Sequence, residues 1–460
     1  MKNDTKSNSI WTIISGLFSL FVSGVIGLAI PMILEVQEYS LYQTYQLYII
    51  FGGLFHFGFI NGVYLKYGDK DYNNLPYSIF RGFTKYLIYL QIIVQIILIT
   101  IVMIFVVSDK KLVFVYLAIN IGLVNISCYF SLITQFTKRF VIDGKIQLVS
   151  SFVLIGMYFV AFCMGINTYV YFLDIITIGN IFLLIMYLIN NIDVVFGRKV
   201  IIKNEIVECH SRGIFVNLSE VIGIVIVNID SVFINILCDK EVFAMYSFAI
   251  GVVLLYYRFV GVTSKLFFPY FKRVNQKSLI SVYNIMTNIV QCTVLLLLCT
   301  VSVFQVVANY FLPNYTESFI YVYVLIVTVV FKSHIDLLCN TIYKVLDSEK
   351  KFFKNNLFAM IVVVFTNVFA WMFFHKAMAI AWASFASYLI WYMVTDAGVR
   401  KLLEMKEFQI KTKAFLLFDI CLFFMGAFKW NNFLPYFMVS IIYFIFCVKK
   451  YQKGLMNIFI

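Results

Sequence analysis

The sequence predicts an all-α integral membrane protein that crosses the bilayer about fourteen times. Three observations predict this class. Long apolar runs recur along the chain, 62% of the 460 residues are hydrophobic while only 13% are charged, and Lys and Arg gather in every second loop. A soluble protein of this length needs far more polar surface, so a water-soluble globular class is excluded.

Fourteen segments approach the 20 or so apolar residues that a bilayer-crossing helix needs. They cover residues 10–34, 43–67, 84–107, 112–136, 146–166, 169–190, 213–237, 242–264, 279–308, 319–343, 352–374, 377–399, 414–428 and 434–448. The first is longer than a signal-peptide core and lacks a clear cleavage site, so we expect it to be retained. The last two are the shortest.

Basic residues alternate between the two sides of the predicted membrane. The termini and every second loop hold 29 of the 36 Lys and Arg residues, and Arg258 and Lys332 lie within spans. The remaining loops hold only Lys110, Lys111, Lys240, Lys376 and Lys429. Because cytoplasmic loops carry the excess of basic residues, both termini are expected in the cytoplasm. The net charge of +13 thus reflects membrane orientation, and no nucleic-acid partner is expected.

A long polar stretch after the sixth span divides the chain. We expect an N-terminal lobe of six spans (residues 1–190), a cytoplasmic linker (191–212), a C-terminal lobe of six spans (213–400) and an appended pair of helices with a cytoplasmic tail (401–460). Because six is an even number of spans, the chain enters the membrane from the same side at the start of each lobe. That arrangement suits parallel repeats, a common plan of transporters.

Enzyme and metal motifs are missing from the sequence. It contains no phosphate-binding GxxxxGK[ST] loop, no HExxH and no GxSxG. The four His residues are scattered, and the nine Cys residues have no metal-ligand spacing. We therefore expect no enzyme activity, no metal and no disulfide.

Gly58 and Gly62 form a GxxxG spacing at the end of the second span, in the stretch "GFINGVYLKYGDKDYNN". Small residues at this spacing let two helix backbones approach closely. We expect these two glycines to mark a helix contact, which serves either tight packing or sliding of one helix along another.

Several stretches resemble Wzx-type polysaccharide flippases of the multidrug/oligosaccharidyl-lipid/polysaccharide (MOP) exporter superfamily. They are "GLAIPMIL" (residues 27–34), "FHFGFINGVYLKYGDKDYNNL" (55–75), "NIDSVFINILCDKEVFAMYSFAIGV" (228–252) and "YFLPNYTESFIYVYVL" (310–325). Two departures, Glu35 where the family often has Gly and no basic residue after Asp230, leave the substrate and the coupling ion open.

The resemblance implies a fold and a function. Such proteins have two six-helix lobes in a V, the MATE-like or MOP fold. They flip undecaprenyl-diphosphate-linked oligosaccharides from the inner to the outer leaflet of the bacterial cytoplasmic (inner) membrane, for O-antigen or capsule. The expected partners are this lipid-linked substrate, membrane lipids, and a polymerase and chain-length regulator of the same pathway. No cofactor is expected beyond an H⁺ or Na⁺ coupling ion.

Each charged residue inside a span calls for an explanation. A charged side chain at mid-bilayer raises the free energy of insertion by about 2.5–3.5 kcal/mol on insertion scales. The ionisable residues noted there are His56, Asp174, Glu220, Asp230, Arg258, Lys332, His334, Asp336 and Asp419.

Two of these residues, Arg258 and Lys332, suit the diphosphate, since Arg offers a planar fork and Lys a point charge. Glu220, Asp336 and Asp230 are candidates for coupling or charge balance. Structural alternatives stay open: Glu220 with Arg258 as a packing pair, Lys332 with Asp336 as an intrahelical ion pair, and Asp230 solvated near the outer interface.

Two other functions remain as alternatives. A polymerase or ligase of the same pathway would also have many spans, but it typically carries a sizeable outer loop, and all outer loops here are short. A drug or small-molecule exporter of the same superfamily would share the two-lobe plan.

The charge alternation makes a testable prediction of topology. Reporter fusions that are active only outside the cytoplasm should be active after Lys111, Lys240 and Lys376, because these residues lie in the loops poor in basic residues. Fusions after Lys145, Lys203 and Lys354 should be inactive. An active fusion within residues 191–212 would contradict the two-lobe arrangement.

Overall fold

The computed structural model describes residues 18, 21–22, 24–68, 70–106, 109–271, 274, 276–346, 348–405, 410–430 and 432–459. Within these ranges every regular element is a helix, and eleven helices are long and apolar enough to cross a membrane. A bent pair, Val36–His56 with Phe59–Tyr67, makes a twelfth candidate. The short helices Gly24–Ile33 and Ile410–Met425 match the first and thirteenth predicted spans. The predicted class is confirmed.

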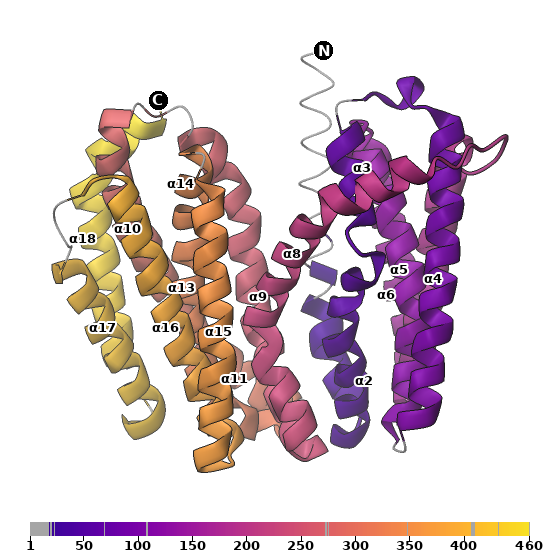
Figure 1. Ribbon diagram of the computed structural model, residues 1–460. Coiled ribbons are helices and arrows are strands. Elements are labelled where there is room, and N and C mark those ends of the chain that lie inside the picture. Colours follow the sequence, from indigo (N-terminus) through magenta and orange to yellow (C-terminus); the bar gives the residue numbers. More distant parts are fainter. Residues whose placement is uncertain are drawn as a thin grey trace. The chain divides into compact units, whose positions relative to one another are not determined.

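The first compact unit is Met1–Asn228, and α5 lies at its centre. It packs against α2, α3, α4, α6 and α7. The helices of this unit, shown in Figure 1, are α2 (Val36–Ile49), α3 (Phe59–Tyr67), α4 (Tyr77–Phe105), α5 (Lys110–Phe136), α6 (Phe140–Cys163), α7 (Tyr169–Asn190) and most of α8 (Lys203–Leu237).

The second compact unit is Ile229–Ile460. Its helices are α9 (Lys240–Phe271), α10 (Gln276–Leu298), α11 (Thr300–Phe311), α12 (Phe319–Ile326), α13 (Thr328–His334), α14 (Asn340–Val345), α15 (Glu349–Phe374), α16 (Ala377–Leu402), α17 (Ile410–Met425) and α18 (Leu434–Phe459).

One span, Pro313–Val345, forms the centre of the second unit. It contains α12, α13, α14 and a π-helical turn, η5 (Ile335–Cys339). The most apolar window of this span is 89% buried, against 17–50% for the other ten long spans. Helices α9, α10 and α16 pack around it. The polar side chains of Thr328, Ser333 and His334 on this span are therefore buried inside the unit.

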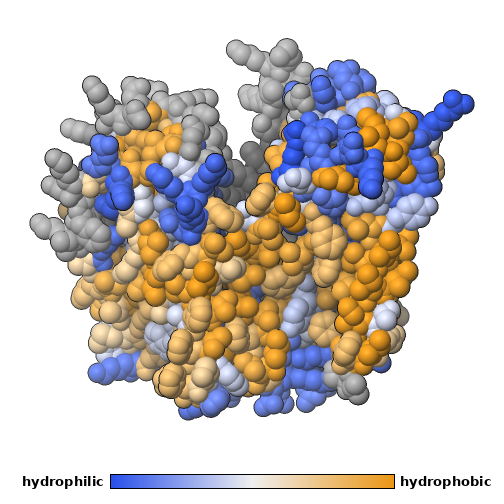
Figure 2. Space-filling model, in the orientation of Figure 1, coloured by the Kyte–Doolittle hydropathy of each residue, from blue (hydrophilic) through white to orange (hydrophobic). Residues whose placement is uncertain are grey.

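On the face that Figure 2 shows, apolar residues cover the middle of each unit and polar residues gather at both ends. Exposed side chains such as Phe105, Phe215 and Phe373 belong to this apolar surface. In a soluble protein such side chains would cause aggregation, whereas in a bilayer they contact lipid.

The segment expected as a linker is partly helical. A short 3-10 helix covers Ile192–Val194, an irregular stretch follows, and α8 already begins at Lys203. The irregular stretch lies against the start of α4, where Val200 N donates to Ser78 O and Arg81 Nε donates to Asp193 O. The two compact units meet within α8, between Asn228 and Ile229.

The second span was expected to be one continuous helix, and this expectation is wrong. The chain bends by 57° between Val36–His56 and Phe59–Tyr67. Phe57 and Gly58 both adopt left-handed backbone conformations, with φ of 49° and 77°. A glycine at the second position lowers the cost of this conformation. The apolar composition of the segment hid the break.

Backbone contact between α3 and α8 explains the glycines beside this break. A Cβ atom on Gly62 would lie 1.7 Å from Cys209 O, and one on Gly58 would lie 2.4 Å from Ile214 N. A Cβ on Gly213 of α8 would lie 1.9 Å from Gly58 O. Both helices thus have glycine where their backbones touch, in a close small-residue contact.

Polar groups of α8 satisfy the backbone at the break. His210 Nδ1 donates to Phe57 O at 2.8 Å, which leaves Nε2 to accept from Tyr86 OH at 2.8 Å. With its amide oriented to serve both groups, Asn217 donates to Gly53 O and accepts from Gly58 N. The broken span therefore keeps its backbone hydrogen-bonded inside the unit.

An ion-pair cluster holds the other end of α3. Lys66 Nζ lies 2.6 Å from Glu205 Oε2 and 2.5 Å from Glu208 Oε2, and Tyr67 OH donates to Glu205 at 2.8 Å. The contacts of residues 66, 62 and 58 fall at progressively later positions of α8, so the two helices run antiparallel. We call this set of glycine, polar and ionic contacts the α3–α8 clamp.

The clamp predicts unequal effects of glycine substitutions. Gly62→Ala and Gly58→Ala should each destabilise the protein by about 1–3 kcal/mol, because the new methyl group overlaps backbone that cannot rotate away. Gly58→Leu and Gly62→Leu should also impair function more than Gly52→Leu. Thermal unfolding of purified protein in detergent measures the first effect.

Gly53→Ala is the matched control, because a Cβ there meets nothing within 4 Å. Gly52→Ala meets only the Ile121 side chain, at 3.3 Å, and should cost less than Gly62→Ala. Equal melting temperatures for all four alanine variants would contradict the backbone contact.

Candidate functional site

The predicted partners Glu220 and Arg258 lie in different compact units. Glu220 is exposed on α8 and accepts a hydrogen bond from Asn61 Nδ2 at 3.2 Å. Arg258 is exposed on α9. Their pairing therefore stays a prediction, and Asn61 is a partner of Glu220 that the sequence did not indicate.

The tyrosines beside Arg258 are engaged within the second unit. Tyr256 OH is hydrogen-bonded to Thr300 Oγ1, and Tyr257 OH to Thr328 Oγ1, each at 2.6 Å. Tyr257 also stacks on Tyr388 with ring centroids 6.3 Å apart. These contacts fix both rings against neighbouring helices, so they position the backbone that carries Arg258.

Lys332 and Asp336 form an ion pair along the central span of the second unit. The side chains are 16% and 30% exposed, on a span that is otherwise mostly buried. The Lys332 ammonium also lies 5.4 Å from the centre of the Trp391 ring, and Trp391 Nε1 donates to Asn356 Oδ1 at 3.1 Å. The π-helical turn η5 contains Asp336. Such turns inside α-helices are frequent at functional sites.

Asp230 is buried, so the alternative that it is solvated near an interface is wrong. Its carboxylate accepts hydrogen bonds from Ser231 N at 2.6 Å, Tyr246 OH at 2.7 Å and Ser384 Oγ at 3.0 Å. Every donor among these is neutral.

Among the described residues, no group of three or more His, Cys, Asp or Glu side chains has the arrangement of a metal site.

The other carboxylates noted within the spans accept hydrogen bonds from hydroxyl groups. Asp174 accepts from Tyr116 OH, and the fully buried Asp419 accepts from Ser440 Oγ at 3.0 Å. His56 is buried at the end of η1, the 3-10 helix Ile50–His56 that precedes the break. These contacts tie neighbouring helices together.

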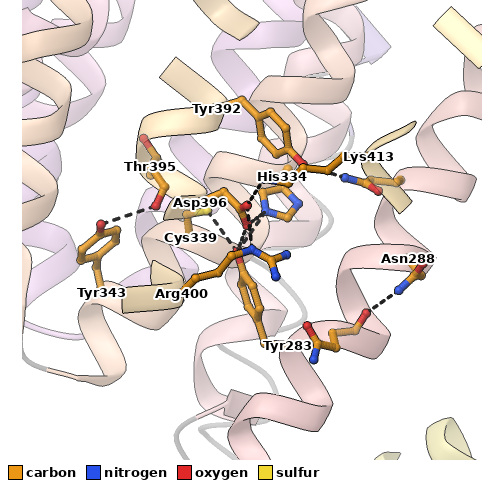
Figure 3. A network of polar contacts seen from close by, with 12 residues as sticks. Tyr283, Asn288, His334, Cys339, Tyr343, Tyr392, Thr395, Asp396, Arg400 and Lys413 are labelled. Carbon is orange, nitrogen blue, oxygen red and sulfur yellow. Dashed lines mark hydrogen bonds and ion pairs between the residues drawn. The ribbon is translucent and has the colours of Figure 1, made fainter. Parts of the chain in front are cut away.

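Among the described residues, the densest charge network centres on Asp396 of α16, which the sequence did not lead us to expect. Figure 3 shows four side chains around this fully buried carboxylate. Tyr283 OH donates to Oδ1 at 2.7 Å, and His334 Nε2 lies 3.3 Å from the same oxygen. Arg400 Nε and Lys413 Nζ donate to Oδ2 at 2.9 and 2.7 Å.

The Asp396 network joins four helices at one point. Its members come from α10 (Tyr283), α13 (His334), α16 (Arg400) and α17 (Lys413), so it ties the first appended helix to the core of the second unit. The signal was present in the sequence as the i, i+4 spacing of Asp396 and Arg400. It was overlooked because Arg400 and Lys413 were assigned to a loop.

The Asp396 network yields a prediction about stability. Asp396→Asn should destabilise the protein by about 3–5 kcal/mol, because Arg400 and Lys413 would lose their buried counter-charge. Thermal unfolding in detergent measures this. Glu404→Gln makes the same change of charge at an exposed position nearby and should be silent. An Asp396→Asn protein as stable as the Glu404→Gln protein would show that the network carries little energy.

Comparison with known proteins gives similar structures but no similar sequence. No model of a known protein family matches the chain. No curated protein sequence matches it either.

Three solved structures are similar over most of the chain. Lipid II flippase MurJ, in its inward closed conformation, is 12% identical and matches with a TM-score of 0.64, covering 98% of this chain and 99% of that one. An inward-facing multidrug resistance MATE family transporter of the MOP superfamily is 10% identical, with a TM-score of 0.57 and coverage of 87% and 96%. A mutant of the Vibrio cholerae MATE transporter VcmN is 10% identical, with a TM-score of 0.54 and coverage of 88% and 99%.

At such low identities the likeness concerns the fold. It extends over nearly the whole of each compared chain. The chain has the fold that these three structures share, the MATE-like fold that the resemblance implied.

Proposed function

We propose that the chain flips undecaprenyl-diphosphate-linked oligosaccharides from the inner to the outer leaflet by alternating access. The observation that carries this proposal is the similarity to the lipid II flippase along 98% of the chain. The two MATE transporters cover 87% and 88%. The similarity to the flippase is thus the more extensive, and its TM-score of 0.64 is higher than 0.57 and 0.54.

The charges support an anionic headgroup as cargo. Arg258 is exposed on α9, and Lys332 lies at a partly exposed edge of the central span. A diphosphate that leaves water needs fixed cations to replace its hydration, and Arg and Lys are the side chains that bind phosphate oxygens. In this proposal Arg258 and Lys332 contact the diphosphate.

A drug exporter is the second candidate, supported by the TM-scores of 0.57 and 0.54 to the two MATE transporters. A polymerase or ligase is less well supported, because the similar solved structures named above are those of a flippase and of transporters. The two transport functions differ in cargo, and the gene-deletion experiment below separates them.

The proposal includes a location and an energy source. The protein would lie in the bacterial cytoplasmic membrane with both termini in the cytoplasm, beside the polymerase and chain-length regulator of its pathway. Transport would be coupled to H⁺ or Na⁺. Asp230 suits a coupling role, because its buried carboxylate accepts hydrogen bonds from neutral donors of Ser231, Tyr246 and Ser384. Glu220, exposed beside Asn61, is the other candidate.

The direct test is deletion of the gene followed by analysis of lipid-linked oligosaccharide on each leaflet. The flippase proposal expects the lipid-linked repeat unit to accumulate on the inner leaflet and surface polysaccharide to be lost. Unchanged distribution of the lipid, with increased drug sensitivity, would favour the exporter instead.

Substitutions of Arg258 test the proposed contact with the diphosphate. Arg258→Ala should abolish surface polysaccharide while the protein still accumulates. Arg258→Lys keeps the charge but loses the bidentate fork, and loss of one charge-assisted hydrogen bond costs about 1.5–3 kcal/mol. Flipping by this variant should therefore be reduced about ten- to a hundredfold.

The double change Glu220→Gln with Arg258→Gln separates substrate contact from a structural ion pair. If Arg258 only neutralises Glu220, the double variant should recover both protein level and transport. If Arg258 contacts the substrate, the double variant should be stable and inactive. Normal transport by the double variant would overturn the assignment of Arg258.

A further inference from the structure

We propose that Asp336 is an internal counter-anion that occupies Lys332 in the empty carrier, gives way to the substrate phosphate, and returns to Lys332 when the substrate leaves. Asp336 would then determine how readily the carrier releases its cargo. This inference rests on the proposed function, in which Lys332 contacts the lipid diphosphate.

The first argument is the placement of the pair. Lys332 and Asp336 are four residues apart on the most buried span, yet their side chains keep 16% and 30% of their surface exposed. Asp336 belongs to η5, which packs against both α9 and α16. The pair thus keeps part of its surface exposed on a span that is otherwise mostly enclosed.

The second argument is that Lys332 stays in place without Asp336. The ammonium lies 5.4 Å from the centre of the Trp391 ring, a distance at which a cation is attracted to the ring face. Trp391 is itself fixed by its hydrogen bond to Asn356. When a phosphate replaces the carboxylate, the ring still holds the ammonium, so only one of its two attractions is exchanged.

The third argument comes from comparison with Asp396 in the same unit. Asp396 is fully buried and has four partners, so no incoming anion can replace it. The Asp336 side chain is 30% exposed, and the ion pair found for its carboxylate is the one with Lys332. A carboxylate that keeps contact with water can give up its cation at small cost, because water takes over part of the interaction. The central span thus contacts a carboxylate that stays in place, Asp396, and carries one that can exchange its partner, Asp336.

Charge counting gives the function of the exchange. Lys332 has one anionic partner in the empty carrier and one in the loaded carrier, so binding does not gain the full attraction of an unpaired buried cation. A carrier needs this balance, because a substrate that is bound too tightly dissociates too slowly on the side of release. Asp336 lowers affinity and in return speeds release.

The Asp336→Asn variant tests the proposal, because its affinity for the lipid and its rate of flipping should change in opposite directions. Purified protein is titrated with undecaprenyl diphosphate by native mass spectrometry, and flipping is measured in liposomes. The variant should bind the lipid at least tenfold more tightly than wild type, with a lower KM and a lower kcat. A residue that only supports folding would lower activity without tightening binding.

Controls separate charge from structure. Glu317→Gln removes an exposed carboxylate of the same unit and should bind like wild type. Lys332→Gln with Asp336→Asn should lose most of the affinity. Asp336→Ser is used if Asp336→Asn does not accumulate, because Ser can bond to the carbonyl four residues back in its own helix. Inorganic diphosphate, titrated separately, shows whether the headgroup alone produces the effect.

Each outcome decides between the two proposals. If wild type and both Asp336 variants all fail to bind undecaprenyl diphosphate, the proposed function fails. If wild type binds and neither Asp336→Asn nor Asp336→Ser binds more tightly, the counter-anion proposal fails alone. Tighter binding with slower flipping supports it.

Discussion

Polar groups inside a bilayer must find their partners within the protein, and most features of this structure follow from that constraint. The bend at Phe57 and Gly58 frees backbone groups that a straight helix would have satisfied. They are satisfied only because α8 brings His210 and Asn217 close to the bend. The glycines of the α3–α8 clamp make this approach possible, so the break and the helix contact form one feature.

The same constraint explains how the second unit holds its charges. Asp396 satisfies two cations at once and joins four helices, among them the first helix of the appended pair. Asp230 is satisfied by hydroxyl and backbone donors. Lys332 and Asp336 satisfy each other and remain partly exposed. Burial and number of partners therefore separate carboxylates that support the fold from one that can exchange its partner.

The sequence was sufficient for the fold class, because apolar segments of membrane length are a strong signal. Each of the fourteen predicted segments overlaps a described helix, the second overlaps a broken pair, and the first is compared only in its described part, where the helix Gly24–Ile33 lies. The bend in the second span was missed because an apolar run does not reveal local backbone angles. Asp396 was missed because Arg400 and Lys413 were assigned to a loop, and because Tyr283 and His334 come from helices that periodicity within one helix cannot bring together. Resemblance indicated the fold, while the placement of each charge needed the packed structure.

The shared helix α8 has a consequence for how the chain can be assembled. Its first part is held to α3 by contacts that are not covalent, and the unit boundary comes later, at Asn228. The residues of the α3–α8 clamp lie on both sides of the irregular stretch before Lys203. A chain divided between Val200 and Lys203 would therefore place the two sides of the clamp on separate polypeptides, which makes the protein a candidate for fragment complementation with glycine packing as the recognition element.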